Sequence, residues 1–313
     1  MPYPDANNHL KTGSFPPEVG KLAVVTCSAG GLGCDIALAL AQAGADVIIA
    51  GRNSGDGHEA LAKIRPLAPD ALVRFEKLDL ESLASVSDFT ARIARAGRPV
   101  DLLVNNACTL ALLKRQVTSD GFELHLGTNF LSHFALTARM LPLLRRGRQP
   151  KVIQVTSAGR HHGQIHLDDL HLAKSYTPLK AYSQSKLAML IFALELQRKS
   201  DGNGWGLVSS AAQPIGTRAA LIANAPAVTG SSGWYKRAIG LSGAESRGGV
   251  LQQLEASSDG DVQVAAPPAA KKLTELIGPP AADALDMRAL DKVMGETLWA
   301  IATQLTGSDW SAA

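Results

Sequence analysis

The sequence predicts an α/β fold, a single doubly wound Rossmann domain whose parallel sheet is flanked by helices. Short apolar segments rich in β-branched residues alternate with segments of helical character from about residue 22 to residue 211. Strands that are apolar throughout are typical of a parallel sheet covered on both faces. Their alternation with helices indicates βαβ units. Because no repeat or clear linker divides the 313 residues, we expect one domain over 21–313 behind an N-terminal arm, 1–20.

Each element follows from a local pattern. The expected strands cover residues 22–26, 46–50, 72–78, 101–104, 151–156 and 205–211, with a further short candidate at 262–265. The expected helices cover residues 32–43, 58–64, 83–96, 121–144, 181–198, 244–256 and 287–306. Four prolines oppose regular structure in the arm. Residues 219–243 are rich in Ala, Gly and Ser, so we expect a segment at about 218–245 to cover a substrate cleft.

Composition excludes several classes of protein. The 31 basic and 28 acidic residues leave a net charge of +3, which gives no reason to expect nucleic acid or a membrane as partner. Three cysteines argue against a disulfide scaffold and indicate a reducing compartment. The N-terminus lacks the layout of a signal peptide, and the most apolar stretch, 36–50, is too short to span a bilayer. We expect a cytoplasmic protein without membrane insertion, and whether it forms a homo-oligomer stays open.

A glycine-rich turn follows the first strand, reading TCSAGGLG over residues 26–33. Glycines let the backbone approach a pyrophosphate, and the N-terminus of the following helix offers unpaired N–H groups and the positive end of a dipole. The turn therefore predicts a dinucleotide site. The alternative is a tight strand-to-helix turn with no ligand.

The end of the second strand refines the cofactor. An acidic residue there would hydrogen-bond a ribose 2′-hydroxyl, but this chain has Arg52. A guanidinium can pair with a 2′-phosphate, so we expect NADP(H) to be favoured over NAD(H). The alternative is a solvated surface arginine.

Five separated motifs then resemble, in order and spacing, those of the short-chain dehydrogenase/reductases over about residues 20–217. They are the glycine turn, LDL at 78–80, NNAC at 105–108, VTS at 155–157 and YSQSK at 182–186. Within that family, GQIHLDDL at 163–170 followed by AYSQSKLA resembles the retinol-dehydrogenase-like and protochlorophyllide-reductase-like branch.

The resemblance implies a sheet of seven parallel strands and a catalytic tetrad. The tetrad would be Asn129, Ser157, Tyr182 and Lys186. The expected cofactor-binding residues, which include Arg52 from the argument above, are Thr26, Ser28, Gly31, Leu32, Gly33, Arg52, Asp79, Leu80, Asn105, Ala107, Tyr182, Lys186, Ile215 and Thr217. Among these, Asp79 would contact the adenine and Thr217 the nicotinamide carboxamide. No metal is expected.

The chemistry explains these residue types. Tyr182 and Lys186 are four apart on an expected helix and share one face. A free phenol titrates near ~10, and a neighbouring ammonium favours the phenolate, which makes a better acid or base at neutral pH. The Ser157 hydroxyl would hydrogen-bond the substrate carbonyl, where negative charge develops. Asn129 would help hold a water in a relay with Lys186. Without the upstream motifs, the Tyr–Lys spacing would indicate an exposed pair with no role.

The sequence departs from the family pattern at Cys27, Cys108 and Ile215, where the family usually has glycine. Side chains there could narrow the cofactor site or strain the turn. Because the first and fourth strands are neighbours in this fold, one hypothesis is that Cys27 and Cys108 form a redox-sensitive pair. The alternative is two small residues tolerated in a relaxed loop. The histidines at 161, 162, 166 and 171 match no metal template and favour a loop at the edge of the cleft.

The expected function is hydride transfer between a nicotinamide and a ketone, aldehyde or alcohol, with a hydrophobic substrate of moderate size. One alternative is an NADP(H)-binding sensor or scaffold with weak or no turnover. Another keeps the tetrad but changes the chemistry to epimerisation or dehydration.

Overall fold

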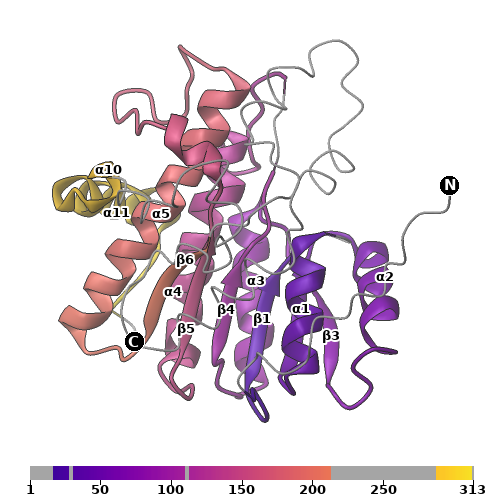
Figure 1. Ribbon diagram of the computed structural model, residues 1–313. Helices are drawn as coiled ribbons and strands as arrows, with labels where there is room; N and C mark the ends of the chain where they lie inside the picture. Colours follow the sequence, from indigo (N-terminus) through magenta and orange to yellow (C-terminus); the bar gives the residue numbers. More distant parts are fainter. Residues whose placement is uncertain (1–16, 28–30, 110–112, 213–286, 312–313) are drawn as a thin grey trace, which may run out of the picture.

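In the part of the chain that the structure describes, six parallel strands form a central sheet, in the order β3-β2-β1-β4-β5-β6 (Figure 1). The computed structural model describes residues 17–27, 31–109, 113–212 and 287–311. The strands are β1 Leu22–Thr26, β2 Asp46–Gly51, β3 Val73–Lys77, β4 Leu102–Asn105, β5 Lys151–Val155 and β6 Val208–Ala212. This is the strand order of a doubly wound nucleotide-binding sheet, so the predicted fold class is confirmed.

Helices connect and flank these strands. They are α1 Leu32–Gln42, α2 Ser54–Ile64, α3 Leu83–Arg95, the π-helix η1 Leu126–Leu131, α4 Ser132–Leu144, the 3₁₀-helix η2 Ala158–His162, α5 Pro178–Asn203, α10 Met287–Leu290 and α11 Lys292–Thr306. Several begin at a side chain that accepts a free N–H group. The Asn53 oxygen accepts from Gly55 at α2, and the Thr177 hydroxyl accepts from Lys180 at α5.

The sheet has a buried core on each face. Leu22 and Val24 of β1 pack with α3, α4 and α5, whereas Ala23 and Val25 pack with α1 and α2. Side chains alternate between the faces of a strand, so a strand covered on both sides must be apolar at every position. This is why the sequence pattern of β1 was readable as a central strand.

Four predicted helices were wrong in extent. The helices expected over 58–64 and 181–198 are longer, because capping by Asn53 and Thr177 begins them earlier, at Ser54 and Pro178, and α5 continues to Asn203. The other two begin late or are divided. The helix expected over 121–144 begins later, because the backbone of Glu123 pairs with Val117 as an antiparallel bridge. The helix expected over 287–306 is divided at Asp291, whose carboxylate accepts the N–H of Met294 at 3.1 Å and begins α11. Helical periodicity continues through a capping residue, so it does not reveal such breaks.

Several predictions fall outside the described residues. These are most of the arm, the segment at about 218–245, the helix expected over 244–256 and the strand expected at 262–265. The count of seven strands is therefore not confirmed, and six strands are seen.

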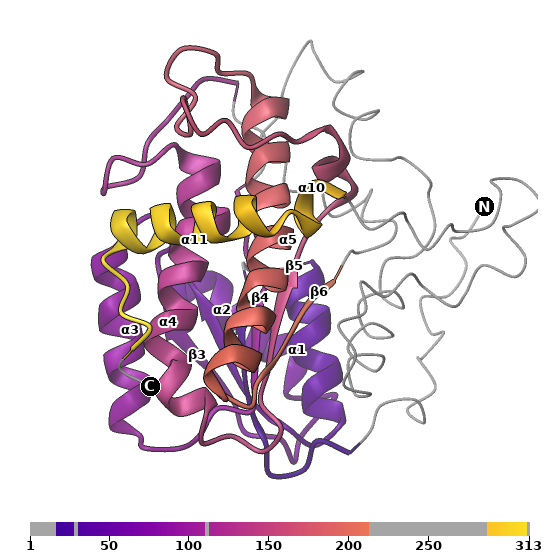
Figure 2. The ribbon, with the colours of Figure 1, turned by 90° about the vertical axis from the view of Figure 1, so that its left-hand side faces the viewer.

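The C-terminal helix α11 lies across α4 and α5 (Figure 2). An aromatic cluster joins them. The ring of Phe134 on α4 is fully buried, and its centroid lies 5.0 Å from those of both Trp299 and Trp310. Phe192 on α5 lies 5.1 Å from Phe134. Within the described part of the chain, no helix has the length and apolar character needed to cross a membrane.

We predict that Phe134→Ala lowers the free energy of unfolding by about 3–5 kcal/mol, because it leaves a cavity among four aromatic neighbours. Phe134→Leu fills more of that space and should cost clearly less. Urea denaturation followed by tryptophan fluorescence measures both variants. An Ala variant as stable as the wild type would show that α11 docks without this cluster.

Candidate active site

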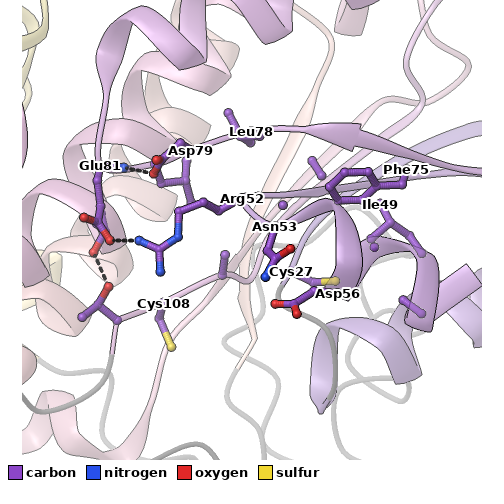
Figure 3. Close-up of a pocket in the computed structure, with 18 residues that line it drawn as sticks. Cys27, Ile49, Arg52, Asn53, Asp56, Phe75, Leu78, Asp79, Glu81 and Cys108 are labelled. Atoms are coloured by element: carbon purple, nitrogen blue, oxygen red, sulfur yellow. Dashed lines mark hydrogen bonds and ion pairs between the residues drawn. The ribbon is translucent and has the colours of Figure 1, made fainter. Parts of the chain in front are cut away.

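A cleft of about 220 Å³ opens at the carboxyl ends of β1 to β4 (Figure 3). Four predicted cofactor residues line it: Arg52, Asp79, Leu80 and Ala107. In a doubly wound sheet, ligands bind at this edge, where the strand order reverses. The cleft therefore lies where the motifs predicted a nucleotide.

The glycine turn beside the cleft requires its glycines. Gly31 has a φ of 78°, in the left-handed region that favours glycine. A Cβ on Gly33 would lie 2.2 Å from the Cβ of Cys27 and 2.5 Å from the Nδ2 of Asn106, so no side chain fits there. Because Gly31 is also the N-cap of α1 and has no side chain, the first N–H groups of that helix stay available to an anion. Ser28 lies outside the described residues.

Thr26 is held by a chain of hydrogen bonds that sequence reasoning missed. The Nδ1 of His133 lies 2.9 Å from the carbonyl oxygen of Asn129, so this nitrogen must carry a proton and donate it. Burial lowers the pKa of His133 to about 4, so the ring is neutral and its Nε2 accepts. The Thr26 hydroxyl, 2.9 Å from that Nε2, is therefore the donor. Thr26 Oγ1 in turn accepts the N–H groups of Asn106 and Ala107 at 2.9 and 3.0 Å.

Asn105 faces the core and does not line the cleft. Its amide donates to Thr137 Oγ1 and to Gln154 Oε1, both at 3.0 Å, and its side chain is fully buried. It supports the turn by joining β4 to α4 and β5.

Tyr182, Lys186 and Ser157 come together at the carboxyl end of β5. Tyr182 and Lys186 are buried on α5, and the Lys186 ammonium lies 6.0 Å from the centre of the Tyr182 ring. Lys186 Nζ donates to the carbonyl of Val155 at 3.0 Å. A Cβ on Gly159 would lie 3.0 Å from Tyr182 Cε1 and 3.5 Å from Ser157 Oγ. Gly159 therefore leaves the edge of the Tyr182 ring and the Ser157 hydroxyl close to each other with no side chain between them.

Asn129 connects the NNAC turn to helix α5. It lies in the π-helix η1, a geometry found frequently at functional sites. Its Oδ1 accepts the Thr109 N–H at 2.7 Å, and its Nδ2 donates to Ser185 Oγ at 3.0 Å. Ser185 Oγ donates to the carbonyl of Tyr182 at 2.7 Å. Asn129 thus fixes the start of α5, while its predicted part in a water relay stays a prediction.

A buried acid–imidazole pair lies behind Tyr182 and was also missed. Glu123 Oε1 lies 2.9 Å from His125 Nδ1, and both side chains are fully buried. Burial alone would raise the pKa of Glu123, but hydrogen bonds from the His125 ring and from the N–H groups of His125 and Leu126 outweigh burial and hold that pKa below its usual value. The His125 ring meets the Tyr182 ring edge-on, with centroids 6.3 Å apart. The pair therefore supports one side of the phenol.

The histidine-rich segment after η2 is a loop fastened to α5. Gln184 accepts the N–H of His166 and donates to the carbonyl of Leu170, both at 2.9 Å. His171 Nδ1 accepts the N–H of Glu123 at 3.3 Å, and its ring stacks on Phe122. Among the residues that the structure describes, no three His, Cys, Asp or Glu side chains are placed to hold a metal ion.

Cys27 and Cys108 both line the cleft as free thiols, the first buried and the second exposed. Burial raises the pKa of Cys27 to about 12, with smaller contributions from Cys34 and Asp56. Cys108 is not among the groups that raise it. The structure thus gives Cys27 the character of an inert core residue, and the pairing of Cys27 with Cys108 stays a hypothesis. Ile215 and Thr217 lie outside the described residues.

Comparison with known proteins gives the family. Residues 21–225 match the short chain dehydrogenase family. Polyprenol dehydrogenase from Mus musculus is 43% identical over 204 residues, 64% of this chain and 61% of that protein. Retinol dehydrogenase 13 from Mus musculus is 37% identical over 201 residues, 63% of this chain and 60% of that protein. The matched part of the chain thus spans about three fifths of the length of these relatives.

A solved structure resembles nearly the whole chain. It is that of an uncharacterized protein from Mycobacterium paratuberculosis, with a TM-score of 0.69, 30% identity, and coverage of 96% of this chain and 98% of that chain. The protein therefore belongs to the short chain dehydrogenase family of oxidoreductases. Within that family it is a member of the retinol-dehydrogenase-like branch.

The buried state of Cys27 predicts unequal thiol reactivity. Because the thiolate is the reactive form, iodoacetamide at pH 8 should label exposed Cys108 and leave Cys27 unlabelled. Peptide mapping by mass spectrometry measures this, and labelling of all three cysteines in guanidinium chloride is the control. Formation of a Cys27–Cys108 disulfide on mild oxidation would contradict the expectation and support the redox pair.

His133 predicts a loss of stability in weak acid. Its folded pKa of about 4 lies below the usual 6.5, so its stabilisation is complete above about pH 6.5 and is lost as pH falls toward 4. Between pH 7 and 5 the wild type should lose about 2 kcal/mol more than His133→Asn. Urea unfolding at both pH values measures the difference. Parallel losses in the two proteins would show that other groups dominate.

Proposed function

We propose that the protein is an NADP(H)-dependent oxidoreductase that interconverts a ketone or aldehyde with the matching alcohol. The observation that carries the proposal is the convergence of Ser157, Tyr182 and Lys186 at the strand edge that also holds the Arg52-lined cleft. A phenol, an ammonium and a hydroxyl around one space can move a proton to or from an oxygen atom.

The residues present fit a dinucleotide. Gly33 leaves the backbone bare where a Cβ would clash, and the start of α1 carries no side-chain cap, which suits a pyrophosphate. Arg52 at the cleft would hold a 2′-phosphate. When bound, NADP(H) supplies or accepts the hydride.

The side chains would then manage the proton and the charge. In reduction, the Tyr182 hydroxyl gives its proton to the substrate oxygen while Ser157 donates a hydrogen bond to that oxygen. The Lys186 ammonium, fixed on Val155, stabilises the phenolate that remains. In oxidation, the phenolate removes the proton from the alcohol.

The relatives support a hydrophobic substrate. Two of them are named for polyprenol and retinol, which are apolar alcohols. We propose a hydrophobic alcohol or aldehyde of moderate size. The rival function, a nucleotide-binding scaffold with weak turnover, is favoured by the Cys27 and Cys108 side chains in the cleft.

Tyr182→Phe separates the two functions. With NADPH and a panel of apolar aldehydes, we predict that turnover falls by about 10²- to 10⁴-fold, because the proton donor is lost, while NADPH binding by fluorescence titration changes little. Tyr176→Phe removes a phenol outside the tetrad and is the matched control. Wild-type protein that binds NADPH tighter than NADH but turns over no aldehyde or alcohol in the panel would favour the scaffold.

A further inference from the structure

Arg52, the residue expected to choose the cofactor, already has an anionic partner. Its guanidinium Nη1 pairs with the carboxylate Oε1 of Glu81, 29 residues further along the chain (Figure 3). Both residues line the cleft. Arg52 follows β2 and Glu81 precedes α3, so the pair joins the ends of two neighbouring βα units beside the cleft.

Glu81 is presented from an anchored backbone. Its N–H donates to Asp79 Oδ1 at 2.9 Å, and its carbonyl accepts from the N–H and hydroxyl of Ser119 at 3.0 and 2.7 Å. These three bonds fix the start of the side chain. The main chain of Glu81 therefore keeps the carboxylate beside the cleft, and only a rotation of the side chain can separate it from Arg52.

The charges around the cleft show why the Glu81 carboxylate affects the binding of a phosphate. Arg52 is the basic side chain among the lining residues, while Asp56, Asp79 and Glu81 are acidic. A 2′-phosphate that reaches Arg52 must displace the Glu81 carboxylate and then remain near it. An ion pair as exposed as this one, with 63% and 36% of the two side chains accessible, contributes little, so the phosphate can take Arg52. The repulsion from the displaced carboxylate persists.

We propose that Glu81 is a cofactor-specificity residue, which competes with the 2′-phosphate for Arg52 and so reduces the preference for NADPH over NADH. The inference rests on the proposed use of NADP(H). An NADH ribose carries a neutral 2′-hydroxyl. A carboxylate does not repel this hydroxyl and can accept a hydrogen bond from it. Discrimination is a difference of two affinities, and the negative charge of Glu81 lowers the affinity for NADPH relative to that for NADH.

The test is Glu81→Gln, which keeps the shape of the side chain and removes its charge. Fluorescence titration should show NADPH binding about fivefold tighter, near the upper range for an exposed ion pair, and NADH binding changed much less. The gain should shrink in 0.5 M salt, because screening weakens exposed charges. Glu76→Gln is the matched control, because Glu76 pairs with Arg74 and Arg92 and does not line the cleft.

A second variant isolates the mechanism. In an Arg52→Gln background, Glu81→Gln should have a smaller effect on NADPH, because the competition for Arg52 is gone and only the direct repulsion of the phosphate remains. An unchanged NADPH-to-NADH ratio in Glu81→Gln, or an equal gain in Glu76→Gln, would overturn the role of Glu81 and leave the proposed function standing. Wild-type protein that binds neither nucleotide would overturn both.

Discussion

The neutral imidazole of His133 is the constraint on which the rest of the site depends. It joins the carbonyl of Asn129 to the hydroxyl of Thr26, and through Thr26 it holds the turn after β4. Each link accepts and donates in one direction, so the chain works with a single tautomer. In a buried environment such a network is strong when complete and costly when one member is unpaired. The start of the glycine turn, the turn after β4 and the π-helix are thereby positioned by the same ring.

Helix α5 shows a second constraint, because it is buried continuously from residue 181 to residue 196. The polar side chains of a helix that is buried on every side need hydrogen-bond partners on neighbouring segments of the protein. Gln184 hydrogen-bonds the loop at 166–170, Ser185 accepts a hydrogen bond from Asn129, and Lys186 donates to the carbonyl of Val155. The polar run that identifies the family thus also attaches three neighbouring segments to the helix. These hydrogen bonds hold together pieces of the site that are far apart in the chain.

The sequence allowed prediction of elements whose signal is local. The strands were readable because burial on both faces makes every position apolar. Arg52, Asp79 and Ala107 could be placed together at the cleft because motifs locate them at strand ends, while their contacts with a cofactor stay a prediction. Glu81 and the Glu123–His125 pair were not predicted, since their importance depends on partners brought near by folding. For His133 a signal existed: it follows Asn129 by four residues and so shares its helix face. Nothing in the sequence indicated that Thr26 would be its second partner.

The distribution of charge around the cleft follows from these placements. The start of α1 offers the positive end of a helix dipole beside the glycine turn, whereas the far wall carries Asp56, Asp79 and Glu81 against Arg52. A dinucleotide has its diphosphate in the middle and a neutral adenine at one end. The positive helix end therefore attracts the diphosphate, and the acidic wall tolerates the adenosine better than a second anion. The acidic wall that favours this orientation of the cofactor also opposes a 2′-phosphate. Under the proposed use of NADP(H), Arg52 is the lining side chain that would have to attract the phosphate against these acidic neighbours.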